Sequence, residues 1–153
     1  MNKFVHSIKR LATGVVLLAS AGGCFAQSPT IANPGVASNG RLDIVVLPSG
    51  LPFVAFQDGS NIKAMACADR ECTSATSVTP IASLTSSRVR ATVGSDGLPV
   101  VSISIINNGL RVVKCQNTQC TVSSTAILES TNLGSTDHAI VIPADGRPLI
   151  AYF

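Results

Sequence analysis

Tryptophan is absent from this chain of 153 residues, and Asp, Glu, Lys and Arg together make up only 12% of it. The chain has 11 basic and 8 acidic side chains, and three of the basic ones, Lys3, Lys9 and Arg10, fall in the first ten residues. Without these three, the basic and acidic groups balance and the remaining chain is formally neutral. Nucleic-acid binding needs clustered Lys and Arg, so we expect no nucleic-acid partner.

The sequence also lacks an apolar run long enough to cross a bilayer, which takes roughly 20 residues. The apolar stretch at residues 11–21 is shorter than that, follows the basic residues Lys9 and Arg10, and precedes two glycines. This order is typical of a secretory signal peptide, which we assign to residues 1–26. We therefore predict export to the periplasm, the cell surface or the medium, without a transmembrane segment.

Two cleavage positions fit the end of this leader. Small residues at Cys24 and Ala26 suit an ordinary signal peptidase, which would release a chain that begins at Gln27. The alternative is a lipoprotein, because residues 21–24 (Ala-Gly-Gly-Cys) resemble the bacterial lipobox and would leave Cys24 lipidated. The residues that follow, 27–40, contain Pro34 and two glycines and are predicted to be irregular.

The rest of the chain repeats with a period of about 48 residues. A turn sequence of the form Ser/Asp-Gly-x-Pro occurs at residues 49–52, 96–99 and 145–148. A Cys-x4-Cys pair occurs at Cys67 and Cys72 and again, 48 positions later, at Cys115 and Cys120. We divide the chain into repeats at residues 41–87 and 88–136 and a partial repeat at 137–153.

Each full repeat is predicted to form four antiparallel strands. The second strand, at residues 53–57, 100–104 and 149–153, is apolar at nearly every position, which predicts burial on both faces. The third strand carries Lys63 or Arg111, which we expect to be single exposed charges on a solvated face. The fourth strand, at residues 73–81 and 121–128, is rich in Ser, Thr and Val and is typical of a sheet edge.

The segment Asp-Gly-Leu-Pro-Val-Val-Ser at residues 96–102, followed by the Cys-x4-Cys pair, resembles secreted bacterial repeat proteins. The resemblance covers residues 41–153 and implies an all-β fold made of four-stranded β-propeller blades. About two and a half blades are present, whereas a closed ring has about four to eight. Three interpretations follow: a fragment of a longer protein, a ring completed by self-association, or an open stack. Stopping within a repeat favours the fragment.

The cysteine pairs are predicted to form the disulfides Cys67–Cys72 and Cys115–Cys120, because both pairs flank a short turn in an exported chain. The alternatives are zinc binding and a redox dithiol. Zinc would need the two pairs to converge, although successive repeats should hold them apart. A redox role is disfavoured because the motif is not Cys-x-x-Cys. We expect no metal and no cofactor.

His138 is the one histidine outside the leader, and it takes a register position that Leu42 and Val89 fill in the other repeats. It is a candidate ligand-lining residue, although a structural role is the simpler interpretation. No nucleophile, base and acid can be assembled into a catalytic set. The leading hypothesis is therefore an exported, non-catalytic module that binds an extracellular protein or glycan. The alternatives are the N-terminal part of a secreted propeller hydrolase or lyase, and a purely structural repeat protein.

Overall fold

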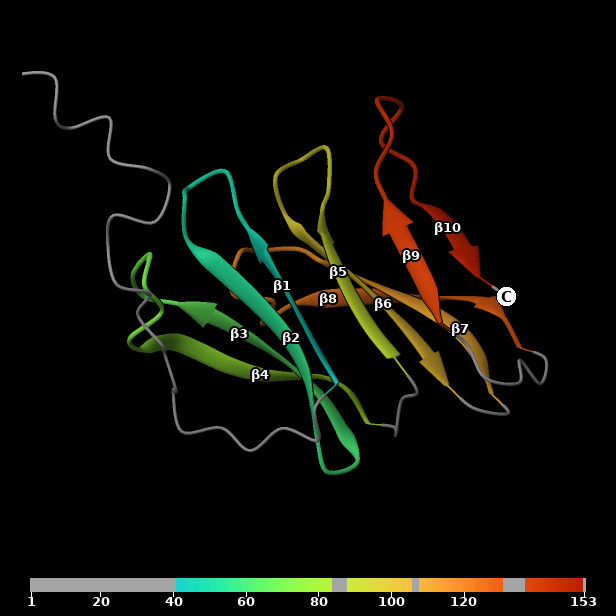
Figure 1. The fold of residues 1–153 in the computed structure, drawn as a ribbon, viewed down its shortest axis with the longest axis horizontal. Coiled ribbons are helices and arrows are strands. Elements are labelled where there is room, and N and C mark those ends of the chain that lie inside the picture. Colours follow the sequence, from blue (N-terminus) through green and yellow to red (C-terminus); the bar gives the residue numbers. More distant parts are fainter. Residues whose placement is uncertain (1–40, 84–87, 106–107, 131–136, 153) are drawn as a thin grey trace, which may run out of the picture. The chain divides into compact units, whose positions relative to one another are not determined.

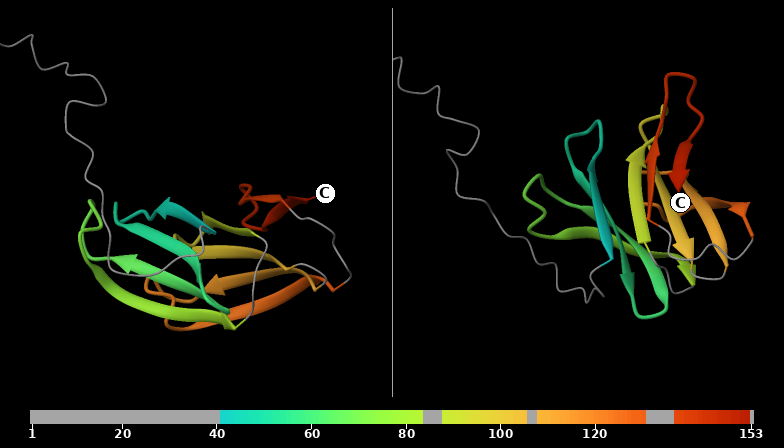
Figure 2. Two further views of the ribbon diagram at one scale, coloured as in Figure 1. Left: turned by 60° about the horizontal axis from the view of Figure 1, so that its bottom comes forward. Right: turned by 45° about the vertical axis from the view of Figure 1, so that its right-hand side comes forward.

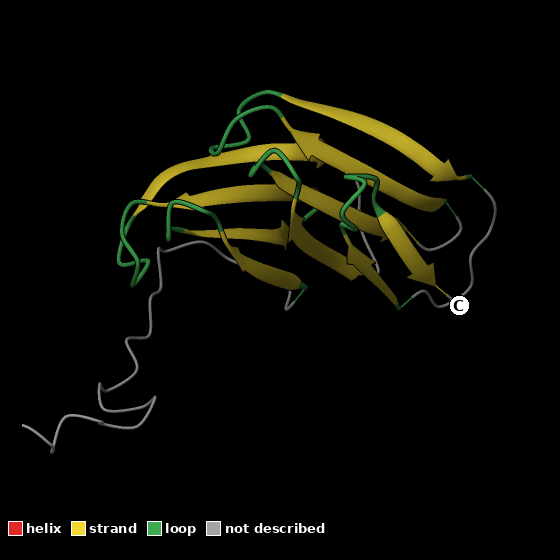
Figure 3. Ribbon diagram, turned by 90° about the horizontal axis from the view of Figure 1, so that it is seen from above, coloured by secondary structure: helices red, strands yellow, loops and turns green. Residues whose placement is uncertain are grey.

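The computed structural model describes residues 41–83, 88–105, 108–130 and 137–152, all within the compact unit Ala32–Phe153. Every regular element in these residues is a β-strand, which confirms the all-β class (Figure 3). Over the same residues, no helix could cross a membrane. The predictions for the leader (residues 1–26), for Cys24 and for residues 27–40 lie outside the described residues.

The strands form three antiparallel sheets, each made of neighbours in sequence (Figure 1). The first sheet contains β1 (Leu42–Val46), β2 (Pro52–Asp58), β3 (Asn61–Cys67) and β4 (Ala75–Ser83). The second contains β5 (Arg88–Val93), β6 (Pro99–Ile105), β7 (Gly109–Cys115) and β8 (Ser123–Glu129). The third contains β9 (His138–Val141) and β10 (Leu149–Tyr152). The two full repeats therefore form the predicted four-stranded sheets, and β4 and β8 lie at sheet edges.

Glycines at equivalent positions close the first hairpin of each sheet. Gly50, Gly97 and Gly146 have φ angles of 81°, 77° and 78°, and each donates its N–H to the carbonyl three residues earlier. Glycine adopts this left-handed conformation without the steric cost that a Cβ atom brings. Proline then begins β2 and β6, because a first strand residue can do without a backbone donor.

The sheets pack face to face, and the same two kinds of face meet at both junctions. We call the side of a sheet that looks toward the next sheet along the chain its following face, and the opposite side its preceding face. Phe53 and Ala55 on the following face of the first sheet belong to one core with Val89 and Ile103 of the second. The other core joins the second and third sheets, and its buried members are Val100, Val112 and Ile140.

The first strands of successive sheets also lie side by side. β1 contacts β5, and β5 contacts β9 (Figure 1, Figure 2). The hairpin turns meet as well: a Cβ atom on Gly97 would lie 3.3 Å from the Cγ of Pro48, and one on Gly146 would lie 2.7 Å from the Oγ of Ser95. Pro48 and Ser95 are equivalent in the repeat, so one stacking arrangement occurs twice.

The prediction that Lys63 and Arg111 are exposed charges is wrong. Lys63 is partly buried and forms an ion pair with Asp58 at 2.6 Å. Arg111 is also partly buried, and its Nε has no hydrogen-bond partner among the described residues. Both side chains stand opposite a buried apolar residue of the neighbouring strand, Phe56 or Ile103, so they share an apolar face of the sheet.

The prediction of burial on both faces holds for two of the three second strands. Strands β2 and β6 are buried almost throughout, whereas β10 is largely exposed. The strand sequences are similar, so the cause is the surroundings. A further sheet covers the following faces of the first and second sheets, and no described residues cover that of the third.

Candidate functional site

The two cysteine pairs form the predicted disulfides, Cys67–Cys72 and Cys115–Cys120. The Cα atoms are 4.9 Å apart in the first and 4.8 Å apart in the second, within the usual range for a disulfide. Each bond spans the turn between the third and fourth strands of its sheet. The second cysteine of each pair has a φ angle of 54°, an uncommon value for a residue with a side chain.

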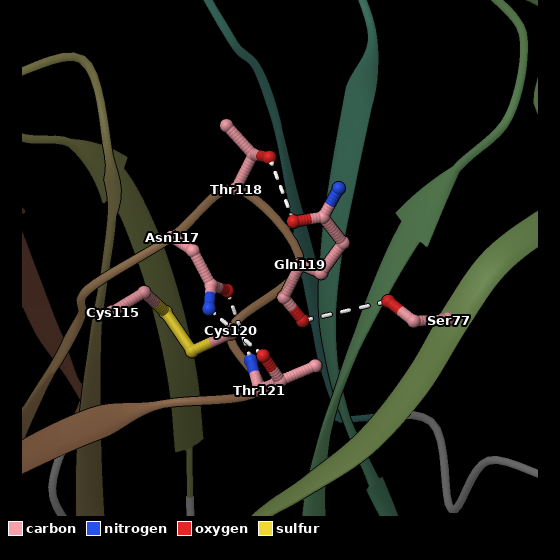
Figure 4. The surroundings of a disulfide bond; sticks show 7 residues. All are labelled: Ser77, Cys115, Asn117, Thr118, Gln119, Cys120 and Thr121. Carbon is pink, nitrogen blue, oxygen red and sulfur yellow. Dashed lines mark hydrogen bonds between the residues drawn. A yellow bond between two sulfur atoms is a disulfide. The ribbon is translucent and has the colours of Figure 1, made fainter.

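An Asp or Asn inside each disulfide loop fixes its shape, a feature that the sequence analysis missed. The Oδ1 of Asp69 accepts the N–H of Thr73 at 2.9 Å, and the Oδ1 of Asn117 accepts the N–H of Thr121 at 3.0 Å (Figure 4). The Thr73 hydroxyl also donates to Asp69, and these bonds hold the pKa of that carboxyl below its ordinary value. The signal was present as Cys-x-Asp/Asn-x-x-Cys-Thr, because such side chains commonly stabilise turns.

These bonds leave no free thiolate for the zinc site that was the first alternative for the cysteines. Zinc binding needs thiolates, and the four sulfur atoms are paired with one another. Throughout the described segments, no cluster of three or more His, Cys, Asp or Glu could hold a metal ion. The disulfide loops are therefore structural staples, and a binding site has to be sought elsewhere.

His138 begins β9 and is buried. Its Nε2 lies 2.8 Å from the hydroxyl of Ser102 on β6, and the tautomer of the ring decides which group donates. Ser102 is itself fully buried. A substrate cannot reach this hydroxyl from solvent, so the pair joins the second and third sheets and is not an accessible nucleophile and base.

An arginine and an aspartate surround the start of β9. The Nη2 of Arg90 lies 3.0 Å from the Oδ1 of Asp137, and its Nε donates to the carbonyl oxygen of His138 at 3.1 Å. The backbone N–H of His138 donates to the same carboxylate at 3.1 Å. Arg88 adds a longer contact of 3.6 Å to Asp137. The arrangement fixes the position of β9 against β5 and concentrates charge at one point.

The equivalent position of the first repeat makes the corresponding link with the opposite charge. Asp43 stands in the register of Arg90, and its Oδ2 accepts the backbone N–H of Ala91 at 2.9 Å. Both side chains thus bridge from one sheet to the next. Ala139 takes this register position in the third sheet, and its side chain has no polar group that could bridge to another sheet.

An open hollow of about 350 Å³ lies beside this cluster. Its lining residues are Arg90, Asp137, His138, Ala139, Ala151 and Tyr152. It offers a guanidinium, a carboxylate and a partly exposed tyrosine beside two alanines. These groups can hydrogen-bond a polar ligand and stack against its apolar face. The hollow is a candidate binding site, and His138 contributes to its wall; its role as a ligand-lining residue stays a prediction.

Asp96 and Asp145 serve their turns and lie outside the lining of this hollow. The Oδ1 of each accepts the N–H two residues later, from Leu98 or Arg147, at 3.1 Å. Asp96 also forms an ion pair with Lys114 at 2.8 Å. That hydrogen bond from Lys114, aided by the Leu98 N–H, keeps the pKa of the Asp96 carboxyl below its usual value.

Comparison of the chain with known protein families gave no matching family, and comparison with curated proteins gave no match either.

Proposed function

We propose that this chain is an exported, non-catalytic binding module. Its sheets act as blades of a β-propeller, each full blade is stapled by a hairpin disulfide, and the hollow beside β9 holds part of an extracellular glycan or protein. The two disulfides indicate a non-cytoplasmic environment and so support export. The repeated face-to-face packing, with β1, β5 and β9 side by side, supports the propeller.

The hollow is the observation that carries the binding role. Its polar groups come from three strands and from Asp137, just before β9, so two sheets hold them in place. The hydroxyl that could act as a nucleophile, on Ser102, is closed to solvent. Polar groups held in fixed positions suit recognition of a ligand, and the buried Ser102 and His138 offer no accessible nucleophile and base for catalysis.

A binding screen with the purified protein tests this proposal. Glycans, cell-surface polymers and surface proteins would be presented to the wild-type chain and to Tyr152→Ser. Tyr152 is part of the hollow and is exposed, so its loss should leave the fold intact while weakening binding. We expect a loss on the order of tenfold, which corresponds to about 1.4 kcal/mol.

Leu128→Ser is the matched control, because Leu128 is an exposed apolar residue of β8, away from the hollow. It should bind as the wild type does. Failure of the folded wild-type chain to bind any of these materials would contradict the proposal. Turnover of a glycan or polymer during the screen would support the alternative, a part of a secreted propeller hydrolase or lyase.

A further inference from the structure

The repeat allows the same register position to be compared in three surroundings. Strand pairing aligns Leu42, Val89 and His138 at the start of the first strand of each sheet, where they pair with Phe56, Ile103 and Tyr152. Positions that are equivalent in this way should have similar burial if their neighbours are equivalent. Differences in burial therefore identify a missing neighbour.

Among the residues that the structure describes, none covers the preceding face of the first sheet in this way. Leu42 is 51% exposed, whereas Val89 and His138 are 1% and 4% exposed. Ile44, the next residue on this face, is 54% exposed, whereas its equivalents Ala91 and Ile140 are buried. Val46 continues the exposed row. Three large apolar side chains along one strand thus face solvent where the other sheets have a packed partner.

The following face of the third sheet also exposes apolar side chains whose equivalents are buried in the other sheets. Phe53 and Val100 are 0% and 3% exposed, but the equivalent residue of β10, Leu149, is 60% exposed. Val141 pairs with Leu149 across the sheet and is exposed as well. Ala139 and Ala151 complete this face, which carries no charged side chain on either strand.

We propose that a second copy of this chain covers these faces by head-to-tail stacking. The following face of the third sheet in one copy packs against the preceding face of the first sheet in the next copy. This is the contact that already occurs twice within the chain, between the first and second sheets and between the second and third. A second copy carries the face that fits, with the register and apolar character of the internal contacts.

The intermolecular contact differs from the internal ones in one respect. Asp43 and Arg90 bridge successive sheets within the chain, whereas Ala139 takes their place at the outer face. The new interface is therefore apolar and has no bridging hydrogen bond from this position. We expect it to be weaker than the internal contacts and to depend on protein concentration. The interface includes Ala139 and Ala151 of the hollow's lining, but the inference does not rest on the ligand of the hollow.

Two substitutions, each placing a charge on one face, provide the test. Ile44→Lys blocks the preceding face of the first sheet, and Leu149→Lys blocks the following face of the third. Burying an unpaired ammonium is costly, so either variant alone should be monomeric in sedimentation and light scattering. The wild type should associate as its concentration rises. Mixing the two variants should give a one-to-one complex that grows no further, because each copy retains one complementary face.

Matched controls distinguish a specific interface from non-specific association through exposed apolar residues. Leu128→Lys and Ile127→Lys place the same charge on β8, at residues as exposed as Ile44 and Leu149 respectively, and should associate like the wild type. Circular dichroism would verify that every variant is folded.

Three outcomes would overturn the proposal. A wild-type chain that stays monomeric at all concentrations would mean that another part of its own polypeptide covers the faces. Continued dimerisation of Leu149→Lys alone would indicate a symmetric contact between two first sheets. Loss of association in the β8 controls would show that the exposed faces are not the interface.

Discussion

The first and second sheets share strand order, turn glycines and disulfide loops, but they differ in what surrounds them. The described residues cover both faces of the second sheet but only one face of the first. As a result, β1 exposes large apolar side chains at the register positions where β5 buries smaller ones. The comparison shows that the strand pattern determines which side chains share a face, while the neighbouring sheet determines whether that face is buried.

Glycines at the start of the third strands, Gly59 before β3 and Gly109 as the first residue of β7, should give the largest difference in stability between the two sheets. Gly59 and Gly109 both have positive φ angles, 57° and 85°. A Cβ atom on Gly59 would meet nothing within 4 Å, so Gly59→Ala should cost only the backbone strain, about 1–2 kcal/mol. On Gly109 the same atom would collide with the carbonyl oxygen of Glu129. Gly109→Ala should therefore cost roughly 3 kcal/mol or more in the free energy of unfolding.

Urea unfolding of both variants measures this difference directly. The two substitutions are chemically identical, so the excess at Gly109 measures the contact with Glu129 together with the less favourable φ angle there. Equal losses would show that β7 and β8 do not approach as closely at this end as described.

Removing the disulfides one at a time should give a smaller difference in the free energy of unfolding between the two sheets. Both loops have the same length, so replacing either pair with alanine should cost about 2 kcal/mol through the gain in unfolded-chain entropy. Cys115 and Cys120 also belong to the large core between the first two sheets. Cys67 and Cys72 pack in a smaller cluster on the first sheet.

The double variant Cys115→Ala/Cys120→Ala should consequently unfold at lower denaturant concentration than Cys67→Ala/Cys72→Ala. Calorimetry or urea unfolding can rank the two, each with the other disulfide intact. If replacing Cys67 and Cys72 cost more stability, the cluster around these two cysteines would contribute more than its size suggests.

The smallest expected effect concerns pH and one ion pair of the second sheet. The hydrogen bond from Lys114 lowers the pKa of Asp96, whereas the first sheet has neutral residues, Ser49 and Ala66, at these positions. A carboxyl with a lowered folded pKa contributes stability above its unfolded pKa of about 3.9 and loses it as the pH falls through the folded value. An NMR titration of Asp96 should show this low pKa, and Lys114→Gln should raise it toward the ordinary value. An unchanged titration would assign the shift to the Leu98 N–H instead.

Local features of the fold could be predicted from the sequence. The disulfides, the positive φ angles of Gly50, Gly97 and Gly146, and the strand starts at Pro52 and Pro99 each depend on a few adjacent residues. The exposure of Lys63, Arg111 and β10 was predicted wrongly, because a strand pattern does not reveal what covers a face.

Predictability of the candidate site was limited for a related reason. The alignment of the repeats singled out His138, but its partner Ser102 is 36 positions away and lies on another sheet. The bonds from Arg90 to Asp137 and to the carbonyl of His138 likewise require knowing which sheets are neighbours. Aligning the repeats does not give this information, because Asp43 and Arg90 make the same bridge with opposite charges.

The contact between successive turns limits how repeats can be exchanged. Gly97 and Gly146 leave space for Pro48 and Ser95 of the repeat before them, so part of each turn's packing belongs to its neighbour. A repeat transplanted alone would bring its glycine without the residue that fills that space. Recombination and protein engineering should therefore succeed best when the exchanged unit runs from the middle of one sheet to the middle of the next.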